Sequence, residues 1–221
     1  MATRQVLAEL VQAYAAHTGC QVEIESVGGV DAARRVQAGE AFDMVVLASD
    51  AIERLITSGR VLAGSRVDLV RSPVAVAVRA GAARPDLQNE ASLRLAVTAA
   101  RSIGFSTGPS GIYLTRLFER WGLTDTLRER MVQAPPGVPV AALVARGDIE
   151  LGFQQLSELL HVEGIAIAGL LPTEIEFITT FSAGVCAGAA QAQAPAVRGL
   201  LDFMTSPAAA EVKRKHGLEP A

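Results

Sequence analysis

Hydrophobic positions along the chain follow a helical period in some segments and a strand period in others. Residues 4–17 carry apolar side chains three and four positions apart and end at Gly19, which predicts an amphipathic helix. Residues 21–26 alternate between apolar and polar side chains, which predicts a strand. Helical and strand segments continue to alternate along the chain, a pattern typical of βαβ units with mostly parallel sheets.

The same reading gives the remaining elements and their division into lobes. Further helices are predicted over residues 30–38, 51–57, 92–100, 112–121, 138–146, 155–160, 195–204 and 207–216, and further strands over 43–47, 67–78, 102–105, 131–134, 151–154 and 177–187. The apolar stretches 74–78 and 182–187 are predicted to cross between two lobes. Lobe 1 then comprises residues 1–77 and 186–221, and lobe 2 comprises residues 78–185. We therefore predict an α/β fold of two lobes with mixed, mostly parallel sheets flanked by helices.

Composition supports a folded globular protein and narrows its partners. Half of the residues are hydrophobic and the mean hydropathy is +0.30, which suits strands buried on both faces. The net charge is −3, from 20 basic and 23 acidic residues spread without long runs, which argues against nucleic acid as a partner. His17, His161 and His216 show no spacing typical of a metal site, and no cofactor is predicted.

Cysteine usage and the absence of long apolar segments bear on the compartment. Cys20 and Cys186 are far apart in sequence, so we interpret them as two buried free thiols, with a single disulfide left open. No stretch approaches the ~20 apolar residues of a membrane span, and residues 1–10 lack the apolar core of a signal peptide. The sequence as written predicts a cytoplasmic protein without membrane insertion, or a periplasmic one if the natural start lies upstream.

A series of motifs in fixed order resembles a known family. They include Thr18-Gly19, Gly28-Gly29, Ser58-Gly59-Arg60-Val61, Ser110-Gly111-Ile112-Tyr113, Ala145-Arg146-Gly147-Asp148 and Phe203-Met204-Thr205-Ser206-Pro207. Their order and spacing, nearly from end to end, resemble the molybdate-binding-protein-like branch of the type 2 periplasmic solute-binding proteins, which also contains proteins similar to aconitate isomerase. The resemblance implies two α/β lobes joined by two strands, with a small anionic ligand held between the lobes at helix N-termini.

Helix N-termini suit an anion for a physical reason, because their N–H groups lack intrahelical partners and carry a partial positive charge. Ligands of open α/β sheets also sit at the carboxyl ends of strands. The candidate ligand-binding residues are Gly28, Gly29, Val30 and Ser49 in lobe 1 and Thr107, Ser110, Gly111, Tyr113, Gln154 and Gln155 in lobe 2. Local alternatives remain open: Ser110 can be a helix cap, Gly28-Gly29 a simple turn, and the Tyr113 ring a packing residue.

Two departures from the family pattern shape the expected ligand. Similar molybdate binders carry Ser after the Gly-Gly turn and Tyr after the late lobe 2 strand, whereas this chain has Val30 and Gln154-Gln155. A tetrahedral oxyanion needs a dense cage of donors, so the departures argue against molybdate and favour a carboxylate. The family's strand before the first helix is also missing from the sequence as written, and a homodimer is one way to complete lobe 1.

These observations give two functional hypotheses. The first is a solute-binding protein that captures a small anion, an oxyanion or a carboxylate, and delivers it to the membrane component of an ABC importer. The second is an isomerase of an unsaturated tricarboxylate, of the aconitate isomerase kind, acting by a proton shift. An enzyme needs a base directed at the ligand, for which Asp50, Tyr113 and Glu158 are candidates, whereas a receptor needs donors only.

Overall fold

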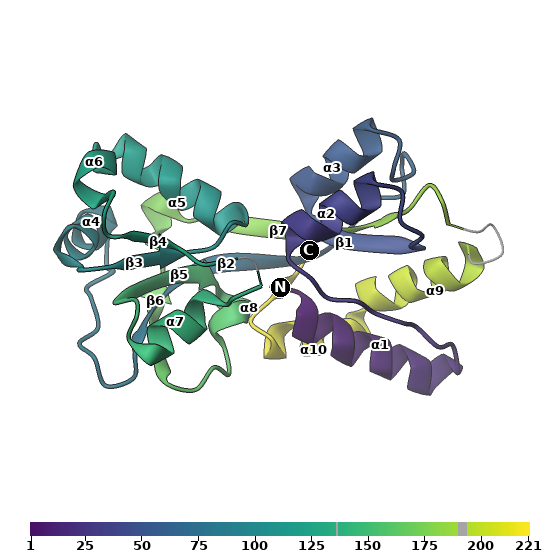
Figure 1. Ribbon diagram of the computed structural model, residues 1–221. Coiled ribbons are helices and arrows are strands. Elements are labelled where there is room, and N and C mark those ends of the chain that lie inside the picture. The colour runs from purple at the N-terminus through teal and green to yellow at the C-terminus, as the bar shows by residue number, and fades with distance from the viewer. Residues whose placement is uncertain (136, 190–193) are drawn as a thin grey trace. The chain divides into compact units, whose positions relative to one another are not determined.

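The computed structural model describes residues 1–135, 137–189 and 194–221 (Figure 1). The chain forms two compact units: unit 1 comprises residues 1–72 and 179–221, and unit 2 comprises residues 73–178. Strand β2 (Val67–Arg79) contributes to both units, and β7 (Ile178–Val185) lies in unit 1 except for its first residue. The boundaries predicted at 77/78 and 185/186 lie a few residues further along the chain. The predicted α/β class, with mixed sheets flanked by helices, is confirmed. The prediction that the sheets are mostly parallel is wrong, because most strand pairs in the described chain run antiparallel.

Unit 1 combines five helices and short antiparallel pairings among the described residues. Strand β1 (Met44–Ala48) runs antiparallel to β7, with Met44 opposite Val185 and Ala48 opposite Phe181. Strand β8 (Glu219–Pro220) pairs with the first part of β2. The helices are α1 (Arg4–Thr18), α2 (Gly29–Gln37), α3 (Ser49–Thr57), α9 (Ala194–Thr205) and α10 (Pro207–Lys215).

The alternation of side chains along β1 gives unit 1 two hydrophobic layers. Val45 and Leu47 pack with apolar residues of α2 and α3, while Ala48 belongs to the cluster formed by α1, α9 and α10. Within this second layer Lys213 of α10 is only 3% exposed, and its ammonium group donates to the Leu69 carbonyl at 2.8 Å. Burial lowers the pKa of Lys213, because an apolar environment disfavours the charged amine.

Unit 2 is built on a mixed sheet. Its strands are the second part of β2, β3 (Ile103–Phe105), β4 (Met131–Gln133), β5 (Leu151–Gln155) and β6 (Ile165–Leu170). Strand β3 lies parallel to both β4 and β5, whereas β2 runs antiparallel to β5 and β6. The parallel strands therefore place their carboxyl ends at one edge of the sheet.

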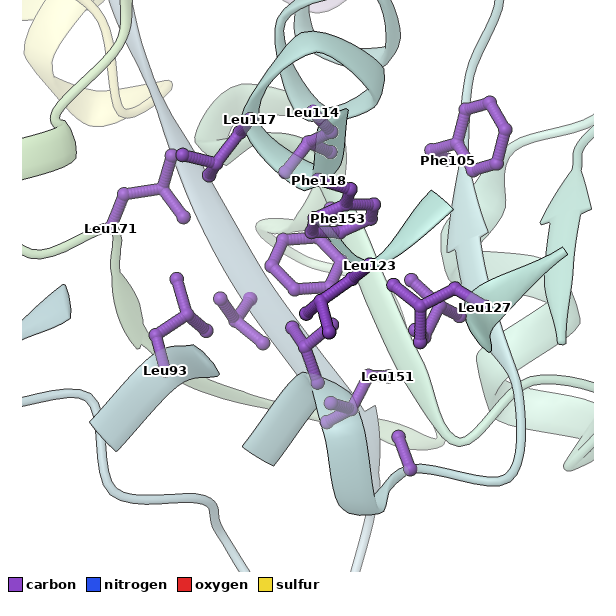
Figure 2. Packing of buried hydrophobic residues seen from close by; sticks show 14 of the residues in the cluster. Leu93, Phe105, Leu114, Leu117, Phe118, Leu123, Leu127, Leu151, Phe153 and Leu171 are labelled. Atoms are coloured by element: carbon purple, nitrogen blue, oxygen red, sulfur yellow. The ribbon is translucent and has the colours of Figure 1, made fainter. Parts of the chain in front are cut away.

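Helices cover both faces of the unit 2 sheet. They are α4 (Glu90–Ala99), α5 (Pro109–Arg120), α6 (Thr124–Leu127), α7 (Val140–Arg146) and α8 (Leu156–Leu159), with a short 3₁₀ turn η1 (Thr173–Ile175). On one face, side chains of α4, α5 and α6 pack on Phe153 of β5 (Figure 2), and the ring of Phe118 meets that of Phe153 edge-on at 6.3 Å. On the other face, Ala75 and Ala77 of β2 pack with Ala141 of α7 and Leu159 of α8.

The strand predicted over residues 21–26 is wrong. This segment has no regular secondary structure and pairs with no strand of the described chain, and Ile24 in it is 40% exposed. An alternating pattern indicates a strand only where a neighbour completes its hydrogen bonds. A side-chain tether replaces the ladder, because Arg35 of α2 holds the Glu25 carboxylate at 2.7 Å.

The two cysteines are free, which excludes the disulfide left open by the sequence. Cys186 is buried as expected, and burial raises the pKa of its thiol to about 11. Cys20 is partly exposed, so the expectation of burial is wrong there, because it follows the end of α1 in a segment without regular secondary structure. No helix in the described ranges is both long and apolar enough to cross a membrane.

Candidate functional site

In unit 1 the N-termini of two helices meet at the carboxyl end of β1. Helix α3 begins at Ser49, directly after the strand. Helix α2 begins at Gly29, near the same end of β1 (Figure 1). A Cβ built on Gly29 would lie 3.8 Å from the side chain of Leu47, which is close to the end of β1. Both helix starts present backbone N–H groups without intrahelical partners, so this end of β1 suits an anion.

The hydroxyl of Ser49 is occupied within unit 1. Its oxygen lies 2.9 Å from the Thr180 carbonyl oxygen and 2.8 Å from the Ser182 hydroxyl oxygen. Ser182 is fully buried and donates its own proton to Asp68 at 2.6 Å. The Arg66 guanidinium, followed by this Ser182 bond, holds the pKa of Asp68 below its usual range, so the carboxylate stays an acceptor.

This network decides what α3 offers a ligand. Because the Ser182 proton goes to Asp68, the single Ser49 proton has inward acceptors in Thr180 and Ser182. Unit 1 therefore presents backbone N–H groups at the start of α3, while the Ser49 side chain hydrogen-bonds to β7 and holds the helix start in place.

The start of α2 has a different character. The Gly28 carbonyl accepts from the Ala32 amide at 2.9 Å, which makes Gly28 the N-cap residue of the helix. Val30 is 61% exposed in the first turn. An apolar side chain thus stands beside the free N–H groups, where a hydroxyl would serve a bare oxyanion better.

In unit 2 the loop between β3 and α5 forms the second helix start. Pro109 occupies the first turn of α5, and the Gly108 amide donates to the Ser106 hydroxyl at 3.3 Å. The Ser106 and Ser110 hydroxyl oxygens lie 3.4 Å apart, and Ser110 is 1% exposed. A Cβ on Gly111 would lie 1.7 Å from the Ser106 carbonyl oxygen, so the loop closes this tightly only because residue 111 is glycine.

Thr107 and Tyr113 flank this loop without sharing one role. Thr107 is exposed at the loop tip. The Tyr113 hydroxyl donates to the Ile175 carbonyl at 2.8 Å, and its ring stacks on Phe177 with centroids 4.4 Å apart. Burial raises the pKa of Tyr113, so the phenol stays protonated and keeps this donor role, while its contact with a ligand stays a prediction.

Gln154 and Gln155 end β5, the parallel neighbour of β3. The pairs Ile103–Leu151 and Gly104–Gly152 set the register, which continues to place Gln154 level with Ser106. Both glutamines are almost fully buried. The Gln154 amide hydrogen-bonds to the Glu158 carboxyl group, while its carbonyl oxygen has no hydrogen-bond partner in the described part of the chain. Burial raises the pKa of Glu158, although the Gln154 bond opposes this shift.

Several site residues were not among the sequence candidates. Ser106 had a local signal, because it opens the small-residue loop already singled out. Asp68 and Ser182 had none, since they are 114 positions apart and meet only through the fold. No group of three or more His, Cys, Asp or Glu side chains that could hold a metal occurs among the described residues.

Comparison with known proteins places this architecture in a family. Residues 1–219 match the family described as bacterial extracellular solute-binding protein. The chain belongs to this family. By sequence, the chain is similar to an aconitate isomerase from Pseudomonas sp., with 38% identity over 96% of this chain and 82% of the relative.

Solved structures extend the likeness of this solute-binding protein at the level of the fold. The periplasmic molybdate-binding protein of Azotobacter vinelandii superposes with a TM-score of 0.79 at 23% identity, covering 98% of this chain and 94% of that one. A periplasmic thiamin-binding protein superposes with a TM-score of 0.77 at 16% identity, covering 97% and 78%. Structures named for such different ligands share the fold, so the ligand must be argued from the site.

Proposed function

We propose that this solute-binding protein captures a small carboxylate anion. The observation that carries the proposal is the pairing of helix N-termini with exposed apolar side chains in their first turns. Val30 at the start of α2 is 61% exposed, and Ile112 at the start of α5 is 54% exposed. Backbone N–H groups satisfy a carboxylate, and the apolar side chains suit the carbon skeleton that a carboxylate brings with it.

The hydroxyl inventory supports a carboxylate over a tetrahedral oxyanion. An oxyanion such as molybdate needs many donors, yet the Ser49 and Tyr113 protons are directed to Thr180, Ser182 and Ile175 inside their own units. The expectation that both lobes close on one ligand remains a prediction.

A second function, isomerisation of an unsaturated tricarboxylate, is favoured by a specific observation. The aconitate isomerase relative aligns with almost the whole chain at 38% identity. Such a reaction uses the same anion-holding groups as a receptor and adds one base.

We propose that the protein works outside the cytoplasm, as its family description indicates. As a receptor it would deliver its ligand to an ABC importer, whereas as an isomerase it would release a product. A homodimer also remains a prediction, and a monomeric mass in solution scattering would count against it.

The first test combines binding with turnover. The purified protein is screened by thermal shift against cis- and trans-aconitate, citrate, sulfate, molybdate and tungstate, and a ligand of the native state raises Tm. We expect shifts with the tricarboxylates alone, followed by interconversion of cis- and trans-aconitate in an NMR assay. A shift with molybdate or tungstate alone would overturn the carboxylate proposal, and binding without interconversion would leave the receptor role.

A further inference from the structure

One carboxyl group in unit 2 combines burial, a hydrogen-bonded partner and a position just after β5, the parallel neighbour of the strand that leads into α5. We infer that Glu158 is the catalytic acid–base group that moves the proton between carbon atoms, and that Gln154 positions it. This inference rests on the proposed isomerisation of an unsaturated tricarboxylate and names the residue that would perform it.

The structure separates the three candidate bases. Asp50 lies on the surface of α3 with 65% of its side chain exposed, paired with Arg54 at 2.7 Å. Tyr113 donates its proton to Ile175 and stacks on Phe177. Glu158 alone of the three combines partial burial with a side-chain hydrogen bond from a buried amide.

The register of the parallel strands places Glu158 near the α5 loop. Gly104 and Gly152 are direct neighbours on one face of the sheet, and both approach side chains of α7. Two positions further on, alternation puts Ser106 and Gln154 on that same face, on strands about 4.8 Å apart. The Glu158 carboxyl group bonds to the Gln154 side chain, so it lies at the strand ends where α5 begins.

Two buried polar atoms on residues close to Glu158 in the chain point to a ligand. The Gln154 carbonyl oxygen and the Ser157 hydroxyl are both buried and have no hydrogen-bond partner among the residues described. Leaving buried polar atoms unpaired is costly, so such atoms mark places where a ligand or water completes the bonding. The Gln154 oxygen needs a donor, which the Glu158 carboxyl group itself provides once it has taken up a proton.

The environment fits the chemistry of a proton shift. Burial raises the pKa of Glu158, which makes the carboxylate a stronger base than an exposed one. Ionised Glu158 takes a proton from the CH₂ carbon next to the C=C bond, and the C–H electron pair enters the three-carbon π system. The negative charge spreads onto a ligand carboxylate held at the α5 N-terminus. The same carboxyl group then returns the proton to the far carbon, and the double bond shifts.

The test separates chemistry from binding. The full-length wild type, Glu158→Gln and the control Glu163→Gln, which changes an exposed glutamate of the same region, are incubated with cis-aconitate in D₂O. NMR follows isomerisation and deuterium incorporation at the CH₂ carbon, and calorimetry gives Kd. We expect Glu158→Gln to lose about 100-fold or more in both rates, as removal of a general base does, while Kd stays within about threefold.

A second pair of variants tests the positioning role of Gln154. Gln154→Ala should lower kcat with little change in KM, and Gln154→Asn should recover part of kcat, because a shorter amide retains the donor. An equal loss of stability and binding in both variants would mean a structural role only.

The outcomes distinguish the proposed isomerase function from the role of Glu158 in it. Wild type that binds but never isomerises or exchanges aconitate overturns the isomerase function, and the inference with it. Wild type that isomerises while Glu158→Gln does so equally fast overturns the inference alone.

Discussion

The two units differ in how the polar side chains at the ends of their strands are hydrogen-bonded. In unit 1, Ser49, Ser182 and Asp68 satisfy one another, and the helix starts present mainly backbone N–H groups. In unit 2, the Gln154 carbonyl oxygen and the Ser157 hydroxyl have no hydrogen-bond partner within the described ranges, and burial raises the pKa of the nearby Glu158. A completed network rigidifies, whereas unpaired buried polar atoms await a partner, so we expect the free hydrogen-bonding capacity of the proposed site to lie in unit 2.

The largest expected effect comes from adding a methyl group at Gly111, in the loop between β3 and α5 of unit 2. Gly111→Ala would place a Cβ 1.7 Å from the Ser106 carbonyl oxygen, so the loop must open. We expect a loss of about 3 kcal/mol in the free energy of unfolding and loss of anion binding, measured by urea unfolding and calorimetry. The control is Gly108→Ala, whose Cβ would meet Ser106 at an ordinary 3.5 Å. Normal binding by Gly111→Ala would contradict the importance of this loop.

Removing the Ser182 hydroxyl tests the hydrogen-bonded network of unit 1. Ser182→Ala removes one hydrogen bond from Asp68, which keeps Arg66, and one from Ser49, which keeps the Thr180 carbonyl, and this should cost about 1–3 kcal/mol of stability. Ligand affinity should change little, because the backbone donors of α3 remain. Thr57→Ala on the surface of α3 serves as the control, and a selective loss of affinity in Ser182→Ala would show that unit 1 reads the ligand through hydroxyls.

Restoring a hydroxyl at the start of α2 sharpens the ligand assignment. Val30→Ser adds a donor at an exposed position and removes apolar surface. One added hydrogen bond is worth about 1 kcal/mol, so a few-fold gain in affinity for molybdate and a similar loss for tricarboxylates are expected. Thermal shift and calorimetry measure both. Unchanged selectivity would mean that the start of α2 takes no part in binding.

The smallest effect is a pH dependence in unit 1. The Arg66 guanidinium lowers the pKa of Asp68, so the folded state binds the proton more weakly than the unfolded chain. This stabilisation is present above the ordinary carboxyl pKa and is lost as the pH falls through the lowered value. The Asp68 side chain is 43% exposed, so about 0.5 kcal/mol is expected after solvent screening. Asp68→Asn should flatten that part of the stability–pH curve, and an unchanged slope would contradict the ion pair.

The sequence predicted the fold where local periodicity and packing agree. Residues 4–17 were assigned correctly because their apolar face is the one that the unit 1 core buries. Residues 21–26 failed because alternation says nothing of whether a neighbouring strand exists. Strand β6 went unassigned because Ile165 to Leu170 alternates between large and small apolar residues, so no polar face marks it as a strand.

The candidate site was predictable only as far as it is local. Ser110 and Gly111 could be predicted because small residues precede a helix. The structure adds that residue 111 must be glycine, because a Cβ there would clash with the Ser106 carbonyl oxygen. The pairing of Gln154 with Glu158 needs the turn between β5 and α8, and the Asp68–Ser182 bond joins distant strands. Such side-chain partners follow from register and topology, which a one-dimensional pattern does not contain.

The burial of Lys213 allows the opening of unit 1 to be followed by chemical labelling. The protein has only two lysines, Lys213 and Lys215, and both lie in α10. Lys215 has 61% of its side chain in solvent, whereas Lys213 is shielded and bonded to Leu69. An acylating reagent should therefore modify Lys215 in the folded protein and reach Lys213 only when α10 detaches from β2. Because unit 2 contains no lysine, mass spectrometry of Lys213 acylation would report the local opening of unit 1 alone.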